Sequence, residues 1–178
     1  MYLCTACGFP KTETLPPVGQ TGTNPTPGNP APDLPKKGSI CRISGGRYKV
    51  TKSNLKNGTV ECMGTSSSKV NFTIPNTVII DGVTYKVTSI GKNAFKNNKK
   101  LKKVTIGSNI TTIGSNAFYG CKNLINITVK STKIKSVGKN AFKGVKANAK
   151  IKVPKSKLSD YQKKFKKKGQ KSTVKITK

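Results

Sequence analysis

A short motif that recurs three times in the second half of this chain limits its possible folds more than any other feature. The sequence Ile-Gly-Lys-Asn-Ala-Phe ends at Phe95, and close variants end at Phe118 and Phe142, so the spacings are 23 and 24 residues. Each phenylalanine is followed nine and eleven residues later by two apolar residues, such as Val104 and Ile106. Self-similarity at this period is typical of a solenoid, in which each repeat buries its apolar side against its neighbours.

The segment between two motifs has the outline L-x-x-L-x-L-x-x-N of a leucine-rich repeat, beginning at Leu101 and ending at Asn109. Val104 and Ile106 alternate with Thr105, which predicts a half-buried strand. The segment 90–95 is short and contains glycine and asparagine, so we expect a turn with a short helical piece that places Ala94 and Phe95 in the core.

The recurring apolar positions define a predicted core. Its members are Ile90, Phe95, Leu101, Val104, Ile106, Ile113, Phe118, Leu124, Ile127, Val129, Val137, Phe142, Ile151 and Val153. The third repeat has polar Asn148 where the first two have Leu101 and Leu124. A weakened core position is typical of a terminal repeat, so we expect a cap to follow.

The pattern I-G-x-x-A-F-x-x-C-x-x-L-x-x-V-x-I resembles the BspA-type leucine-rich repeats of bacterial cell-surface proteins. The matching residues are Phe118, Cys121, Leu124, Ile127 and Val129. Asn98 and Val145 stand where that pattern often has cysteine. The resemblance covers roughly residues 70–178. It implies a secreted or wall-attached interaction module rather than an enzyme.

Composition and periodicity divide the chain into five segments. We predict a remnant of a Cys-x-x-Cys repeat at 1–14, a proline-rich linker at 15–38, a β-rich N-terminal cap at 39–86, leucine-rich repeats at 87–153, and a helix and strand cap at 154–178. Seven of the ten prolines lie in the linker, which has too few aliphatic residues to offset its ordering entropy. The predicted fold class is therefore a short leucine-rich-repeat solenoid of about two and a half repeats, with a β-rich N-terminal cap and a helical C-terminal cap.

The predicted N-terminal cap consists of short strands with a period of two. Its clearest turn is Asp81-Gly82, because this pair accepts the positive φ angles of a type I′ hairpin. The strand candidates around Cys41 and Cys62 are neighbours, and two interpretations remain open for these cysteines, a disulfide or two buried thiols.

The predicted C-terminal cap contains a helix. Ser156 is its expected N-cap, Leu158, Tyr161 and Phe165 share one face, and Gly169 ends it before a strand at 174–176. The lysine run 163–168 also fits a membrane-binding or nucleic-acid-binding helix, but only three apolar residues oppose it, which favours capping of the solenoid.

Cys4 and Cys7 are the only Cys-x-x-Cys pair. Together with Gly8, Lys11, Thr12 and Glu13, they resemble the tail of a small repeat found in secreted bacterial proteins. A structural zinc site needs four ligands, and the chain has no histidine and no second Cys-x-x-Cys. A truncated repeat or a simple disulfide is therefore favoured over a metal site, and we predict no metal and no cofactor.

We also predict no catalytic residues, because catalysis needs acid, base or nucleophilic groups that converge. The chain has no histidine, and its five acidic residues lie far apart in the sequence. Cys121 occupies an apolar repeat position with no base nearby in the motif. The repeated glycines serve the repeat turn and do not form a phosphate-binding loop.

The charge of the chain is strongly one-sided, with 35 basic and five acidic residues and a formal net charge of +30. The outward positions of stacked strands should form one continuous surface: Lys103, Thr105, Asn126, Thr128, Lys130, Lys150 and Lys152. Lysines there either keep the solenoid soluble or bind polyanions.

We predict an adhesion module whose partners are host or cell-surface proteins, or anionic wall polymers or glycans. The alternative is a nucleic-acid-associated protein, which the scarcity of arginine and exposed aromatics disfavours.

The expected location is extracellular or cell-wall associated, as the resemblance implies. No apolar run approaches the roughly 18 residues of a membrane helix, and Met1 is not followed by a signal-peptide pattern. We therefore expect the sequence to be a fragment of a longer surface protein.

Overall fold

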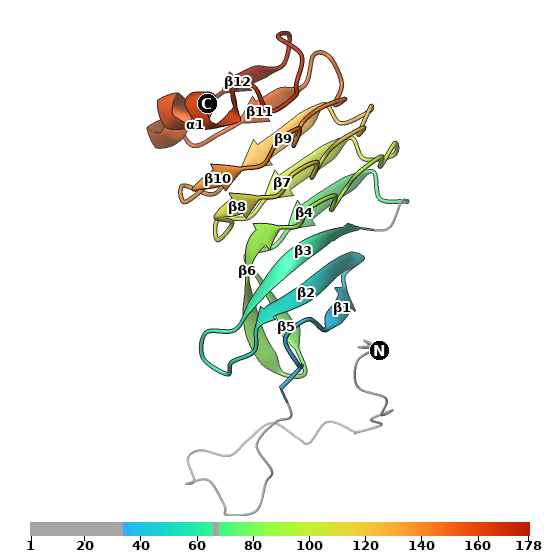
Figure 1. The fold of residues 1–178 in the computed structure, drawn as a ribbon, viewed down its shortest axis with the longest axis vertical. Helices are drawn as coiled ribbons and strands as arrows, with labels where there is room; N and C mark the ends of the chain where they lie inside the picture. The colour runs from blue at the N-terminus through green and yellow to red at the C-terminus, as the bar shows by residue number, and fades with distance from the viewer. Residues whose placement is uncertain (1–33, 66–67) are drawn as a thin grey trace, which may run out of the picture.

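The computed structural model describes residues 34–65 and 68–178 (Figure 1). The Cys-x-x-Cys segment and the linker up to residue 33 lie outside the described residues. The last part of the predicted linker belongs to the fold, because Pro35 is buried and Leu34 packs against the core. The backbone N–H of Gly38 also donates to Val50 O at 2.8 Å.

The chain forms an elongated solenoid in which strands stack along the long axis (Figure 1). A parallel sheet has the order β12-β11-β9-β7-β4, and a mixed sheet has the order β1-β2-β3-β6-β8-β10 with β5 paired to β6. The parallel sheet consists of β4 (Asn71–Ile74), β7 (Lys103–Ile106), β9 (Asn126–Val129), β11 (Lys150–Lys152) and β12 (Lys175–Thr177). The mixed sheet consists of β1 (Ile40–Ile43), β2 (Gly46–Lys52), β3 (Thr59–Thr65), β5 (Thr77–Ile80), β6 (Val83–Ile90), β8 (Thr112–Ile113) and β10 (Ser136–Val137).

The predicted fold class, a leucine-rich-repeat solenoid, is confirmed, but the solenoid is longer than the expected two and a half repeats. It has about five turns, each with one strand in the parallel sheet. The additional strands are β4 and β12, which the sequence places in the two caps. β4 pairs in parallel with β7, and β12 pairs in parallel with β11, so both continue the ladder of the repeats.

The motif segments form turns that hydrogen-bond from one repeat to the next. Asn93, Asn116 and Asn140 have φ angles of 60°, 55° and 57°, in the left-handed region that asparagine tolerates. The expected short helical piece at 90–95 is therefore wrong, because a left-handed residue interrupts it, and residues 92–97 form turns instead.

In the second and third repeats the motif glycine, Gly114 or Gly138, lies against the backbone of the preceding turn, whereas Gly91 in the first repeat faces the side chains of Glu61 and Met63. A Cβ added to Gly114 would lie 2.6 Å from the backbone N of Lys92, closer than any side chain permits. The recurrence of glycine at this position therefore follows from the close approach of successive backbones.

The core runs without a break along the solenoid. All the predicted core residues are buried, and Ala94, Ile110 and Ala117 join them. Aromatic rings form a spine through its centre, in the order Phe72, Phe95, Phe118, Phe142 and Phe165. Neighbouring ring centroids in this spine lie 5.1–5.8 Å apart, within the range of favourable aromatic pairs.

The N-terminal cap is built from hairpins. Asp81 and Gly82 have φ angles of 48° and 76°, and Ile80 pairs with Val83, which confirms the predicted hairpin turn. Cys41 pairs with Tyr48, and Tyr48 pairs with Cys62, so β2 lies between the two cysteines. Two strand spacings, roughly 9–10 Å, separate their Cα atoms, too far for a disulfide. The interpretation as two buried thiols is therefore correct.

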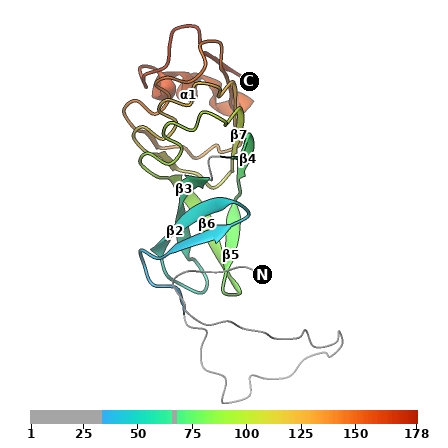
Figure 2. The same cartoon turned by 90° about the vertical axis from the view of Figure 1, so that its right-hand side faces the viewer.

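The C-terminal cap lies across the last turn (Figure 2). A 3₁₀ turn (Lys155–Lys157) leads into α1 (Leu158–Phe165), in which Tyr161 and Phe165 are buried. The expected capping role of Ser156 is wrong, because Ser156 lies within the 3₁₀ turn and no side chain caps α1. The helix ends at Phe165, where Lys166 leaves the helical conformation, before Gly169 is reached.

A candidate interaction surface on the parallel sheet

The parallel sheet turns one side toward the core and the other toward solvent, so its outward side chains form two rows in register. The first row contains Asn71, Lys103, Asn126, Lys150 and Lys175. The second row contains Thr73, Thr105, Thr128, Lys152 and Thr177. Adjacent members of a row are one strand spacing apart, about 4.8 Å. We call these two rows, together with Lys130, the cationic face.

All seven residues predicted for the binding surface lie on this face. The lysines are exposed, and Thr105, Asn126 and Thr128 are half-buried between their neighbours. Lys130 follows β9 directly, and its backbone N–H donates to Ile106 O at 2.9 Å. The sheet therefore brings together residues that are up to 49 positions apart in the sequence.

Sequence reasoning missed the two outer members of each row, which are Asn71, Thr73, Lys175 and Thr177. Their strands were assigned to the caps and not to the repeats. A signal was present, because Asn71-Phe-Thr-Ile has the same pattern as Asn126-Ile-Thr-Val.

The cationic face contains no acidic residue. Among the residues that the structure describes, the acids are Glu61 on β3, Asp81 in a hairpin turn and Asp160 on α1. The ion pair within this part of the chain joins Lys164 to Asp160, with 2.6 Å between Nζ and Oδ1. Lys150 and Lys175 are opposite each other in the ladder, and like charges in that arrangement destabilise a sheet.

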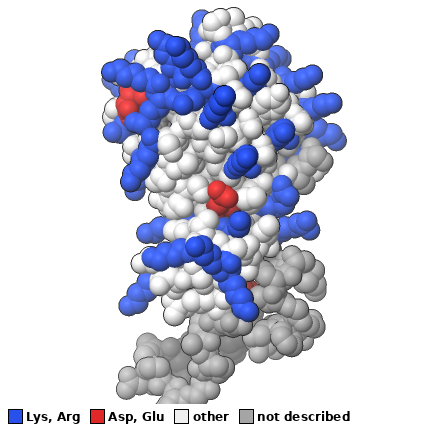
Figure 3. All heavy atoms as spheres, in the orientation of Figure 1, with Lys and Arg blue, Asp and Glu red and all other residues white. Residues whose placement is uncertain are grey.

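Lysine side chains also occur away from the cationic face. Figure 3 shows basic side chains at every level of the visible side of the molecule and acidic ones in few places. On the mixed sheet, the outward row contains Glu61, Ser89, Thr112 and Ser136, and it continues to Lys49 on β2. Both sheets carry exposed basic residues, so the cationic face is distinguished by its lack of acidic side chains.

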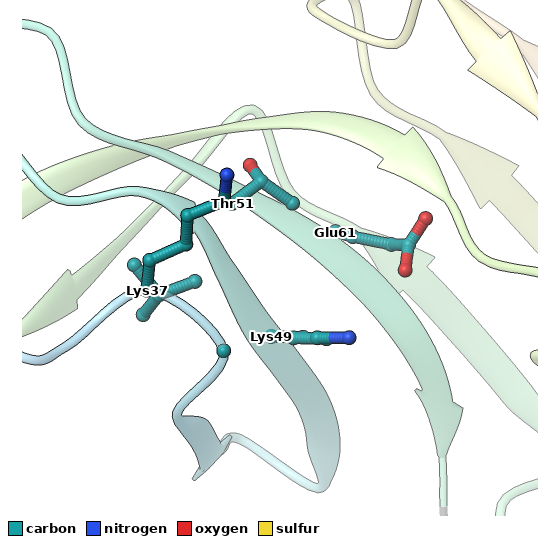
Figure 4. A pocket seen from close by; sticks show the side chains of 6 residues that line it. Lys37, Lys49, Thr51 and Glu61 are labelled. Atoms are coloured by element: carbon teal, nitrogen blue, oxygen red, sulfur yellow. The ribbon is translucent and has the colours of Figure 1, made fainter.

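A shallow groove of about 360 Å³ lies in the N-terminal cap (Figure 4). Its lining residues are Lys37, Gly38, Lys49, Val50, Thr51 and Glu61. Lys49 and Glu61 are opposite each other on β2 and β3, and Ser89 Oγ lies 3.5 Å from Glu61 Oε1. One carboxylate, one hydroxyl and two lysines at an open groove form neither a nucleophile–base pair nor a metal site.

Cys121 has a structural role in the repeat. Its side chain is fully buried, and its thiol donates a hydrogen bond to Phe95 O at 2.9 Å. Burial raises the pKa of Cys121 to about 12, so the thiol stays protonated and unreactive at neutral pH. Asn98, at the equivalent position of the previous repeat, accepts hydrogen bonds from the backbone N–H groups of Lys100 and Leu101 instead.

Within residues 34–65 and 68–178, no three His, Cys, Asp or Glu side chains cluster in a way that could hold a metal ion. None of the helices in this part of the chain has the length and apolar character needed to cross a membrane.

Comparison with known proteins agrees with this architecture. Residues 71–178 match the model of the BspA type leucine rich repeat region, in six copies. No curated protein matched the chain.

Several solved structures are similar to this chain, including two with TM-scores above 0.5. A leucine rich cell surface protein from Faecalibacterium prausnitzii A2-165 is 27% identical with a TM-score of 0.51, over 64% of this chain and 32% of that one. A leucine-rich repeat protein from Bacteroides capillosus ATCC 29799 is 23% identical with a TM-score of 0.55, over 66% of this chain and 83% of that one. The chain thus spans about a third of the length of the first protein and most of the second. Because the family model covers more than half of the chain, this protein belongs to the BspA-type leucine-rich repeat family.

Proposed function

We propose that this protein is a non-catalytic adhesion module at the cell surface or outside the cell, and that its cationic face binds an anionic glycan. The family and the similar cell surface protein support a surface interaction role. The observation that carries the choice of ligand is the register of the cationic face, which aligns lysines along the solenoid axis with no acid among them.

The spacing of charge on this face favours one kind of anion. From β4 to β11 the first row alternates amide and ammonium, so two strand spacings, roughly 9.5 Å, separate Lys103 from Lys150. Lys175 on β12 follows Lys150 after one spacing. An extended polysaccharide advances by close to one strand spacing per sugar. A polymer with a carboxylate on every second sugar would therefore meet a lysine at each carboxylate and an asparagine between them.

The second row adds hydrogen-bonding groups beside the charges. Thr105 and Thr128 offer hydroxyls one strand spacing apart. Both side chains are half-buried, which limits their freedom to move. Individual exposed ion pairs contribute little, about 0–1 kcal/mol, so affinity would have to come from several contacts along one polymer. An adhesion module that meets a repeated polymer satisfies this condition.

The experiment compares two variants with the same loss of charge. In the first, Lys103, Lys150 and Lys152 are replaced by Gln. In the matched control, the exposed cap residues Lys52, Lys56 and Lys86 are replaced by Gln. Binding to hyaluronan, in which every second sugar is a uronic acid, is titrated at 50 mM and 200 mM salt.

We expect the first variant to lose binding that the control keeps. Its slope of log affinity against log salt should become shallower, because fewer lysines then contact carboxylates and fewer counterions are released. Equal loss in both variants would show that net charge alone binds the polymer and would contradict the proposal. Tighter binding of the unchanged protein to duplex DNA than to hyaluronan would favour the nucleic-acid alternative.

A further inference from the structure

A second line of lysines lies in the segments that lead from the motif turns to the strands of the parallel sheet. Lys99, Lys122 and Lys146 each follow a spine phenylalanine by four residues, and all three are exposed. The equivalent positions on the cationic face are interrupted by Asn126, whereas this column has a lysine in every one of the three turns. We call it the lysine column.

The backbone of successive turns holds the lysine column in line. Phe95 N donates to Ala117 O at 2.7 Å, and Phe118 N donates to Ala141 O at 2.8 Å. Two residues later, Asn97 N donates to Tyr119 O and Gly120 N to Lys143 O, at 2.7 and 2.8 Å. These bonds resemble a parallel ladder, so the residues just before the three lysines (95–97, 118–120 and 142–144) are spaced like strands, about 4.8 Å apart.

The same local conformation recurs in each turn. Asn97, Gly120 and Gly144 all occupy the left-handed region, with φ angles of 60°, 71° and 79°. The side chain of Asn123 donates from Nδ2 to Lys99 O at 2.6 Å, and this bond links the second turn to the first beside Lys122. Backbone hydrogen bonds thus hold the turns just before the lysines, and at the third lysine Lys146 N donates to Leu124 O at 3.2 Å. A backbone that is ordered in this way lowers the cost of ordering on binding.

The part of the sequence that contains the lysine column has no acidic residue. The sequence contains no acidic residue between Asp81 and Asp160, and the carboxylate of Asp160 pairs with Lys164. A neighbouring line adds Lys96 and Lys143, with Tyr119 between them. The Lys96 Nζ lies 5.8 Å from the centre of the Tyr119 ring, so even this lysine is held by an aromatic face and not by an anion.

We infer that the lysine column is a second polyanion site, and that it takes a linear polyol phosphate with one phosphate for each turn of the solenoid. Closely spaced anions suit this column because a lysine is present in each of the three turns, whereas from β4 to β11 the first row of the cationic face has a lysine on every second strand. The ammonium of lysine binds phosphate as a point charge and requires no bidentate geometry. Such a polymer would bridge neighbouring turns and offset the repulsion between their lysines.

This inference extends the proposed function to a second site, and the two are tested separately. In one variant Lys99, Lys122 and Lys146 are replaced by Gln, and in its rescue variant by Arg. The cationic-face variant (Lys103, Lys150 and Lys152 to Gln) and the cap control (Lys52, Lys56 and Lys86 to Gln) carry the same charge change as the Gln variant. Each protein is titrated with poly(glycerol phosphate) and with hyaluronan, after circular dichroism has shown that it is folded.

The column variant should lose at least tenfold in affinity for poly(glycerol phosphate), and its affinity should depend less steeply on salt. Its affinity for hyaluronan should equal that of the cap control. The Arg variant should bind like the unchanged protein. Glycerol phosphate monomer at the same total phosphate concentration should not compete, because it cannot span two turns.

Three results would overturn the inference. The first is a loss of poly(glycerol phosphate) binding in the column variant no larger than in the cap control. The second is a larger loss in the cationic-face variant, which would place the phosphate polymer on the other site. The third is tighter binding of single-stranded DNA of equal charge through the same lysines, which would assign the column to nucleic acid. A cationic-face variant that still binds hyaluronan normally would instead contradict the proposed function and leave the column standing.

Discussion

The ring of Phe118 stacks on the ring of Phe95, with 5.1 Å between the centroids and 9° between the planes. The two residues occupy the same place in successive repeats, so the stack shows the repeats in register at the centre of the core. Phe142 continues the stack at 5.8 Å and 3°, and Phe165 of α1 closes it at 5.6 Å. The spine thus links the repeats to the C-terminal cap through one row of aromatic contacts.

Replacement of Phe118 by alanine should be strongly destabilising. Phe118 is fully buried and contacts an aromatic ring on each side, so its loss leaves a cavity between two turns. We expect the free energy of unfolding to fall by about 3–5 kcal/mol, measured from urea denaturation. Phe142→Ala should cost a similar amount, because Phe165 flanks it on the far side.

The loss of stability in Phe72→Ala can be compared with that in Phe118→Ala to test the role of the spine. Phe72 stands at its first position, has one ring neighbour in the spine and is 7% exposed, so its replacement should cost less than that of Phe118. Equal losses at both positions would show that the spine does not set the stability of the solenoid.

Tyr161→Phe tests the attachment of the C-terminal cap. The buried Tyr161 hydroxyl donates to Ser131 O at 3.0 Å and accepts from the backbone N–H of Ile134 at 2.9 Å. Removal of the hydroxyl leaves the buried N–H of Ile134 without this acceptor, which should cost about 1–3 kcal/mol. Thermal unfolding checks this, with Tyr119→Phe on the half-exposed turn as a control that should change little. A Tyr161→Phe protein as stable as the parent would mean that α1 is held by its apolar face alone.

The start of the folded unit can be located by truncation. A chain that begins at residue 33 should melt at the same temperature as the full chain. A chain that begins at Lys37 loses the buried Pro35 and the core contacts of Leu34, so it should be less stable by about 1 kcal/mol. Differential scanning calorimetry distinguishes the two. A large loss already in the longer chain would show that residues 1–32 stabilise the solenoid.

The buried thiols predict a specific dependence of stability on alkaline pH. Burial raises the pKa values of Cys62 and Cys121 from 9.0 to about 12. A raised pKa in the folded state means that the stabilising contribution is complete below pH 9 and is lost as pH rises toward 12. The measurement is the difference in unfolding free energy between the parent and Cys121→Ala, in a Cys4→Ser, Cys7→Ser background. This difference cancels the effect of lysine titration and should shrink between pH 9 and pH 11.

Thiol accessibility provides an independent check of the same prediction. At pH 8 in this background, none of the three buried cysteines should react with a thiol reagent until the protein unfolds. Fast modification of Cys121 in the native protein would contradict the burial of its thiol.

The recurring motif was sufficient to predict the fold class. Its period requires each repeat to bury one side against the next, and the aliphatic alternation around Thr105 and Thr128 allows only one side of the strand to face inward. The outward residues of β7, β9 and β11 could be named for the same reason. The Asp81-Gly82 turn could be predicted because few residue pairs tolerate its backbone angles.

The extent of the solenoid was decided by tertiary pairing. β4 and β12 lack the full motif, and they belong to the parallel sheet because β7 and β11 offer open ladder edges beside them. The separation of Cys41 from Cys62 depends on the register of β2, which hydrophobic alternation alone does not define. The turns at Asn93, Asn116 and Asn140 replace a helix because backbone pairing between repeats competes with local helical bonds and is repeated three times. Residue types and their period thus determined which side chains face inward. Contacts between distant segments decided where the repeats begin and end and which lysines align. Those choices depend on pairing partners that lie far away in the sequence, so the local pattern could not make them.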